Sequence, residues 1–226
     1  MPLLLHHESN VAMNQTDTPR DLERPSFERR RLPTTSKSQA TVAQILKATQ
    51  ELLADKGFSR ITTNEVARRA GVNISSLYQY FSSMESVALA LFEQVASENS
   101  ELMRENVLRH LEHDIDIAMP KMIRALVRLY RDNQTVLLRL PDELPELRAL
   151  SPAQDIRNVV VSIGRLYIEQ QRPDLNSRKR EIAYQFLSNS TLANIRNYLL
   201  LAPPFISETA FVGELSRSIV AYIRAI

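Results

Sequence analysis

The sequence predicts an all-α protein, because glycine is scarce, proline is unevenly placed and apolar residues recur at helical spacing. The 226 residues include only 4 glycines, whereas a β-rich fold of this length needs more of them in its turns. None of the 11 prolines falls between Thr34 and Met119, so that long stretch is free to be helical. Apolar residues make up 44% of the chain and charged residues 24%, as in an ordinary globular protein.

Residues 1–33 lack sustained periodicity and mix proline with polar residues, which predicts a disordered arm. The arm ends in the basic run Glu28-Arg29-Arg30-Arg31. Flexible arginines beside a DNA-binding module can enter a minor groove, and a solubilising linker is the other interpretation. The short apolar opening of the chain is not a signal sequence, so we expect a cytoplasmic protein without a membrane partner.

Residues 34–82 predict three helices. The first begins at Ser36-Lys-Ser-Gln39, which has capping-box spacing, and ends at Lys56-Gly57. The second begins at the capping box Thr62-Thr-Asn-Glu65 and is broken by Gly71. The third follows from Ile74 to about Tyr80.

Residues 83–226 predict a helical bundle. A capping box at Ser82-Ser-Met-Glu85 opens a long helix, and the prolines after it punctuate the pattern. The further helices are expected at Met119 to about Arg139, Asp155–Gln171, 177–201 with Asn176 or Ser177 as its cap, and from Ser207 to the end, with a loop or short helix around Pro141–Pro152.

Two short helices separated by a glycine turn are typical of a helix-turn-helix. The first helix holds the second, which presents its N-terminal residues to base edges in the major groove, and here those are Asn73, Ile74, Ser75 and Ser76. Residues 20–70 carry 11 Lys or Arg and 6 Asp or Glu, although the whole chain has a net charge of only +2. This local surplus indicates a polyanionic partner or, as the alternative, a solvated basic face.

The string Ile61-Thr-Thr-Asn-Glu-Val-Ala-Arg-Arg-Ala-Gly-Val-Asn-Ile-Ser-Ser-Leu-Tyr-Gln-Tyr-Phe81 resembles the signature of the tetracycline-repressor-like (TetR) family. The resemblance covers residues 37–92. It implies that Thr63 contacts a phosphate, that Asn64 lies near a base, and that Ile74, Ser75 and Ser76 face bases. It also implies backbone or base contacts for Tyr78 and Tyr80, which could instead be half-buried packing residues, whereas Leu77 and Phe81 are expected in the core.

Many members of this family carry lysine where this chain has Met84, at the start of the long helix. That lysine supports a phosphate contact, which methionine cannot make. We therefore expect the affinity for DNA to depend on Lys37, Arg68, Arg69 or the arginine arm, and whether Met84 weakens binding stays open at this point.

The resemblance also implies a C-terminal ligand-binding bundle whose last two helices form a homodimer, and repression that a small molecule relieves. A dimer is expected independently, because paired half-sites are the usual solution for a helix-turn-helix. The apolar residues of 177–201 and 207–225 could pair in such an interface or belong to the chain's own core. Candidates for the pocket, each of a kind that is more often simple core, are Met103, Met119, Met122, Tyr130, Tyr167 and Tyr184. The effector, the operator and the sign of regulation stay open.

The partner expected for such a regulator is a double-stranded DNA operator. Two other classes of protein are alternatives to a DNA-binding regulator. His110 and His113 lie three residues apart on an expected helix, as metal ligands can in a helical metal protein or enzyme. A helical interaction protein that no longer binds DNA is the second alternative. The sequence lacks cysteine and the usual nucleotide-binding and hydrolase motifs, so we expect no enzyme activity, no catalytic residues, no metal and no cofactor.

Overall fold

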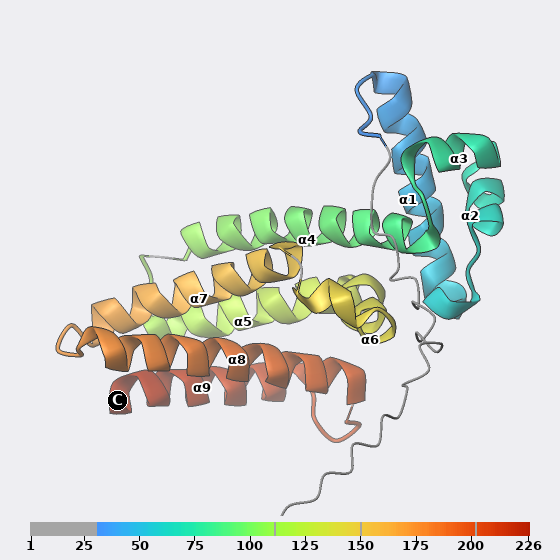
Figure 1. The fold of residues 1–226 in the computed structure, drawn as a ribbon. Coiled ribbons are helices and arrows are strands. Elements are labelled where there is room, and N and C mark those ends of the chain that lie inside the picture. Colours follow the sequence, from blue (N-terminus) through green and yellow to red (C-terminus); the bar gives the residue numbers. More distant parts are fainter. Residues whose placement is uncertain (1–30, 111, 150, 202) are drawn as a thin grey trace, which may run out of the picture.

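The computed structural model describes residues 31–110, 112–149, 151–201 and 203–226, and it confirms the all-α fold. Within those ranges the chain forms helices and no strand, and Figure 1 shows how they are arranged. The helices are α1 (Ser36–Lys56), α2 (Thr63–Ala70), α3 (Ile74–Tyr80), α4 (Met84–Leu108), α5 (Ile115–Asp132), α6 (Leu140–Glu143), α7 (Ser151–Gln171), α8 (Ser177–Leu201) and α9 (Glu208–Ala225). Most of the predicted arm, residues 1–30, lies outside the described part.

Three short segments join these helices. They are the 3-10 helix η1 (Phe58–Arg60), the π-helical segment η2 (Thr135–Arg139) and the 3-10 helix η3 (Pro145–Ala149). No helix in the described ranges is long and apolar enough to span a bilayer.

Two predicted caps are wrong by one residue. Helix α1 is capped by Thr35 rather than Ser36, because Thr35 has the extended backbone of a cap and its hydroxyl accepts a hydrogen bond from the Ser38 N–H. Helix α4 is capped in the same way by Ser83, whose partner is Ser86 rather than the predicted glutamate. In both capping boxes a serine hydroxyl closes the motif that glutamate usually closes.

The other expected helix boundaries near the turns are confirmed. Thr62 caps α2 and Gly71 ends it in the left-handed conformation, with φ of 68°. Asn176 caps α8, since its side-chain oxygen accepts a hydrogen bond from the Lys179 N–H at 2.9 Å. Ser207 caps α9.

The helix predicted from Met119 begins four residues earlier, because Asp114 caps α5 and leaves Pro120 inside the helix. The regular α-helix ends at Asp132, and the predicted continuation to Arg139 is the π-helical segment η2. Helix α7 begins at Ser151 rather than Asp155, since a proline in the first turn has no hydrogen bond to lose.

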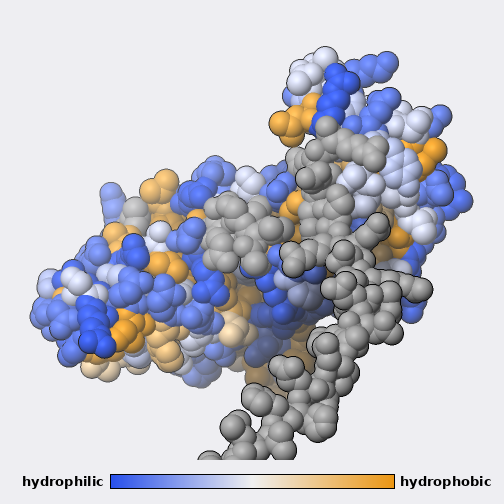
Figure 2. All heavy atoms as spheres, in the orientation of Figure 1, coloured by the Kyte–Doolittle hydropathy of each residue, from blue (hydrophilic) through white to orange (hydrophobic). Residues whose placement is uncertain are grey.

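Helix α4 connects the two ends of the molecule (Figure 1). Its first turns pack with α1, and it then runs along α7 within the bundle that α5, α8 and α9 complete. One apolar cluster extends from α1 to α9. On the face that Figure 2 shows, hydrophilic residues cover much of the described surface and hydrophobic residues lie in separate patches.

Helix α3 is held in place by Leu77 and Phe81, which are 0% and 1% exposed, in accordance with the core position expected for both. The cluster that receives them includes Ile45 of α1, Val66 of α2 and Val87 of α4. Burial against α1 and α4 therefore holds the two short helices in place.

Replacing Phe81 by alanine should lower the free energy of unfolding by about 3–5 kcal/mol, because it removes a fully buried aromatic side chain. The measurement is urea denaturation followed by circular dichroism. Phe205→Ala is the matched control, since Phe205 is 85% exposed and should change stability by less than about 0.5 kcal/mol. Equal effects of the two substitutions would contradict this assignment of the core.

Candidate nucleic-acid interface and ligand cavities

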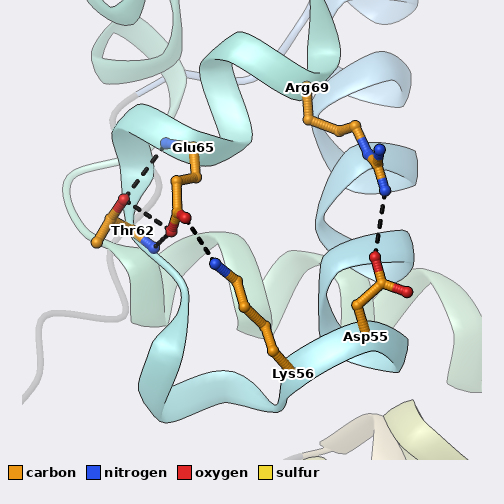
Figure 3. Close-up of polar contacts among 5 residues, drawn as sticks. All are labelled: Asp55, Lys56, Thr62, Glu65 and Arg69. Carbon is orange, nitrogen blue, oxygen red and sulfur yellow. Dashed lines mark hydrogen bonds and ion pairs between the residues drawn. The ribbon is translucent and has the colours of Figure 1, made fainter.

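The first turn of α2 is fixed by a capping box that is itself anchored to α1. The Thr62 N–H and hydroxyl each donate a hydrogen bond to Glu65 Oε2 at 3.1 Å, and the Glu65 N–H donates to Thr62 Oγ1 at 3.3 Å. The ammonium group of Lys56, the last residue of α1, lies 2.6 Å from Glu65 Oε1 (Figure 3). The hydrogen bonds from Lys56 and then Thr62 lower the pKa of Glu65 below its ordinary value.

A second ion pair ties the last turn of α2 to α1. The Arg69 guanidinium lies 3.1 Å from a Glu51 oxygen and 3.3 Å from an Asp55 oxygen, the latter drawn in Figure 3. All three groups are exposed, so the pairs add little stability. The two ion pairs nevertheless engage Arg69, which is one of the arginines expected to contact a phosphate.

The turn that follows Gly71 leads directly into the cap of α3. The Asn73 side-chain oxygen accepts hydrogen bonds from the Ser75 N–H at 2.9 Å and from the Ser75 hydroxyl at 2.8 Å. The Tyr78 and Thr63 hydroxyl oxygens lie 3.0 Å apart, so the start of α2 contacts the middle of α3. This contact brings two of the predicted residues, Thr63 and Tyr78, to one surface.

The eight predicted DNA-contacting residues differ in how far they reach solvent. Four are exposed and four are half-buried. The exposed ones are Asn64, Asn73, Ser75 and Tyr78, and the half-buried ones are Thr63, Ile74, Ser76 and Tyr80. Ile74 and Tyr80 pack against the core cluster.

One exposed residue of α3, Gln79, is not among the residues predicted to contact DNA. Tyr78 and Gln79 lie three and four residues after Ser75, so all three belong to one face of the helix. The helical spacing of Gln79 from Ser75 was the signal that could have identified it.

Basic residues near this surface fall into two groups. Lys37, Lys47, Arg60 and Arg68 are exposed, and none has an ion pair within the part of the chain that the structure describes. Arg69 is already paired with α1. Met84, which stands at the lysine position of the family, is half-buried against the core.

The bundle encloses a small apolar cavity between α4, α5, α7, α8 and α9. Its free volume is about 40 Å³, and Met103, Met119 and Met122 line it together with Leu126 and Ile163. Methionine adapts readily to the shape of a ligand. Three of the predicted pocket residues are thereby brought to one cavity.

The predicted tyrosines lie outside this cavity. The Tyr167 hydroxyl donates toward the His110 carbonyl oxygen at 3.4 Å, and the Tyr184 hydroxyl donates to Glu169 at 3.2 Å. Tyr130 lines a separate hollow near α6. The sequence could not separate them, because all three are simply apolar positions of their helices.

His110 and His113 lie in the turn between α4 and α5, with ring centroids 5.4 Å apart. Burial, followed by the nearby charge of Lys121, lowers the pKa of His110. Across the described ranges, no three histidine or acidic side chains gather in a way that could hold a metal ion. The structure therefore adds no support to the metal-protein alternative.

The N-terminal helices are similar to those of known regulatory proteins. Residues 45–91 match the family model described as bacterial regulatory proteins, tetR family. The HTH-type transcriptional regulator YerO of Bacillus subtilis is 26% identical over 163 residues, which cover 64% of this chain and 54% of that protein. The chain thus spans about half the length of this curated relative.

Solved structures show the same fold over most of the chain. A chain from Mesorhizobium loti assigned to the TetR family superposes with a TM-score of 0.66 at 15% identity, covering 84% of this chain and 98% of that one. The regulator FadR of Bacillus subtilis, solved in complex with stearoyl-CoA, superposes with a TM-score of 0.57 at 16% identity, covering 81% and 97%.

Replacing Lys56 by methionine should raise the pKa of Glu65 toward its ordinary value, because the largest cause of the lowered pKa is removed. A lowered pKa in the folded state adds stability above the unfolded pKa, and this stability is lost as the pH falls through the folded pKa. As the pH falls, the variant should therefore lose the stability that ionised Glu65 gives to α2 at a higher pH than the wild type does. The measurement is an NMR titration of the Glu65 carboxyl carbon.

Lys47→Met is the control, since Lys47 is an exposed lysine of the same helix without an ion pair among the described residues. An unchanged Glu65 pKa in the Lys56 variant would show that the ion pair does not form in solution.

Proposed function

We propose that this chain, whose residues 45–91 match the family model for bacterial regulatory proteins of the tetR family, is a sequence-specific DNA-binding transcriptional regulator. The observation that carries the proposal is the arrangement of α2 and α3, which presents short polar side chains on one surface while Leu77 and Phe81 anchor the opposite face. This is the arrangement in which a recognition helix enters the major groove.

Base reading is assigned to the exposed face of α3 and to its first turn. Ser75 and Gln79 share that face, and glutamine can form two hydrogen bonds to an adenine. Asn73, Ile74 and Ser76 belong to the turn that would enter the groove first. The amide nitrogen of Asn73 is available for a base, because its oxygen is the acceptor that caps the helix.

Phosphate contacts are assigned to the beginning of α2 and to the aromatic residues of α3. Thr63 stands at the first position of α2, where backbone N–H groups favour an anion, and Asn64 follows it. The Tyr78 hydroxyl, beside that of Thr63, and Tyr80 would complete this side of the interface. Arg68 supplies an exposed charge that Met84 does not.

A homodimer is the state that we propose for DNA binding. Helices α8 and α9 pack together and leave Ile182 and Phe186 59% and 53% exposed. The Phe186 ring lies 5.0 Å from that of Tyr222 on α9, so the exposed apolar surface is continuous across both helices. A second copy would bury it and would set two recognition helices at half-site spacing.

Repression that a small molecule relieves is the regulation we propose. The cavity lined by Met103, Met119 and Met122 is almost wholly apolar, which suits an effector with an apolar body. With about 40 Å³ it is far below the roughly 300–1,000 Å³ of typical ligand sites, so binding must move the surrounding helices. The FadR structure with stearoyl-CoA supports an apolar effector for this fold.

DNA binding is tested by selecting duplexes from a randomised pool and measuring affinity for the selected and a random duplex by fluorescence anisotropy. Ser75→Ala and Gln79→Ala should each lower the preference for the selected duplex about tenfold, since a specific base contact contributes about 1–3 kcal/mol. Arg68→Ala should weaken binding to both duplexes and reduce the salt slope by about one.

Gln170→Ala is the matched control, because Gln170 is an exposed glutamine of α7. The DNA-binding proposal fails if no duplex is enriched, or if the Gln79 and Gln170 variants retain the same preference.

The dimer is tested by sedimentation equilibrium of the full chain. Phe186→Asp should shift the protein to a monomer, because it places a charge in the apolar surface that the second copy is proposed to cover. Phe205→Asp is the control, since Phe205 is exposed in the turn before α9. A wild-type protein that is monomeric at micromolar concentration would refute the proposed interface.

A further inference from the structure

A hollow of about 440 Å³ lies at the end of the bundle nearest α6, the short helix that Figure 1 places beside the lower end of α1. Its size falls within the range of small-molecule sites. It has no lining residue in common with the methionine-lined cavity or with the hollow between α8 and α9. Neither the proposed effector cavity nor the proposed dimer surface therefore accounts for it.

Three arginines from three different elements line this hollow, which we call the arginine hollow. They are Arg148 of η3, Arg157 of α7 and Arg196 of α8. Arg196 donates to both carboxylate oxygens of Asp142 at 2.5 and 2.6 Å, and Arg148 pairs with the same carboxylate. Arg157 donates to the side-chain oxygen of Asn189 at 2.6 Å and has no acidic partner among the described residues. The cluster therefore holds three positive charges against one negative charge.

The remaining wall is mostly apolar, with Asn189 and Tyr130 as its other polar residues. Phe92, Leu137 and Leu138 are buried and close the base of the hollow. An inorganic anion would leave this surface without a partner, whereas a hydrocarbon or aromatic body would cover it. Tyr130 also lines the hollow, and burial raises its pKa to about 12, so its phenol stays protonated and can donate a hydrogen bond to an anion.

We propose that the arginine hollow binds an organic acid with an apolar body, whose carboxylate takes the place of Asp142 on Arg196 and is also bound by Arg157. The Asp142 carboxylate shows where the carboxylate of such a ligand would bind, because the Arg196 Nη2 group already donates to both of its oxygens. The side chain of Asp142 is the internal competitor of the ligand.

The same short helix connects this hollow to the DNA-binding helices. Glu143, the neighbour of Asp142 on α6, accepts hydrogen bonds from the Phe58 N–H at 3.1 Å and the Ser59 N–H at 3.0 Å. These N–H groups begin η1, directly after α1. A Cβ atom added to Gly57 would lie 3.2 Å from Glu143 Oε1, so the glycine permits this close approach.

Displacement of Asp142 removes the ion pairs that hold α6 to α8 and η3, and it thereby loosens the placement of Glu143 against η1. The binding site stands on its own geometry. Its regulatory consequence, weaker DNA binding in the presence of the acid, rests on the function proposed above.

Ligand binding is tested first, by isothermal titration calorimetry of the full chain without DNA. The probes are decanoate, phenylacetate and the uncharged decanol, so that aliphatic and aromatic acids are distinguished from a purely apolar ligand. One acid should bind with one site per chain, and decanol should bind at least about tenfold more weakly, because it lacks the charge-assisted hydrogen bonds.

Arg157→Ala should weaken binding of that acid about tenfold, and Asp142→Asn should strengthen it by removing the competitor. A misfolded variant would not bind the acid more tightly, so stronger binding by Asp142→Asn cannot arise from misfolding. Asp116→Asn is the matched control, because Asp116 forms an exposed ion pair with Arg224 between two other elements, and it should leave binding unchanged. Gly164→Val should also leave binding unchanged, since Gly164 lines the methionine-lined cavity.

Asp142→Asn should also weaken binding to the selected duplex in the absence of any acid, while Asp116→Asn should not. The site proposal is overturned if neither acid binds, or if binding is indifferent to both Arg157→Ala and Asp142→Asn. Acid binding that follows these two variants without any change in DNA affinity overturns the regulatory step alone. A protein that binds the acid as expected but enriches no duplex would refute the DNA-binding function and leave the site in place.

Discussion

The burial of Leu77 and Phe81 is the constraint on which the proposed DNA-binding surface depends. Helix α3 has only seven residues, too few to be stable by itself, and these two side chains attach it to the core shared by α1 and α4. The capping box of α2 and the Lys56 ion pair then set the neighbouring helix at a defined angle. The polar face of α3 is exposed because Leu77 is buried on the other face, where Ile74 and Tyr80 are half-buried.

The long helix α4 belongs to both ends of the molecule, because it packs with α1 and also along α7. A second connection runs through α6, where Asp142 is held by arginines of η3 and α8 and Glu143 accepts two hydrogen bonds from the start of η1. Two adjacent carboxylates thus join segments that are far apart in the sequence.

Much of the candidate site follows from local sequence. Thr62 and Glu65 lie three residues apart, and Gly71 adopts the left-handed conformation that glycine favours, so the helix, turn and helix could be predicted. The capping residues of α1 and α4 were harder to predict, because neighbouring serines and threonines there have equal capping chemistry. The backbone conformation of Thr35 and Ser83 decides which of them caps.

The sequence by itself determined the helical class, the order of the helices and the residues at the start of α3, because periodicity, caps and turns act over a few residues. Only the tertiary structure decided which apolar residues share a cavity, since Met103 and Met122 meet while Tyr130 lies elsewhere. It also decided that Arg196 meets Asp142 across 54 residues and that Glu143 meets Phe58 across 85. Contacts at such separation come from the packing of whole helices, which no local pattern records.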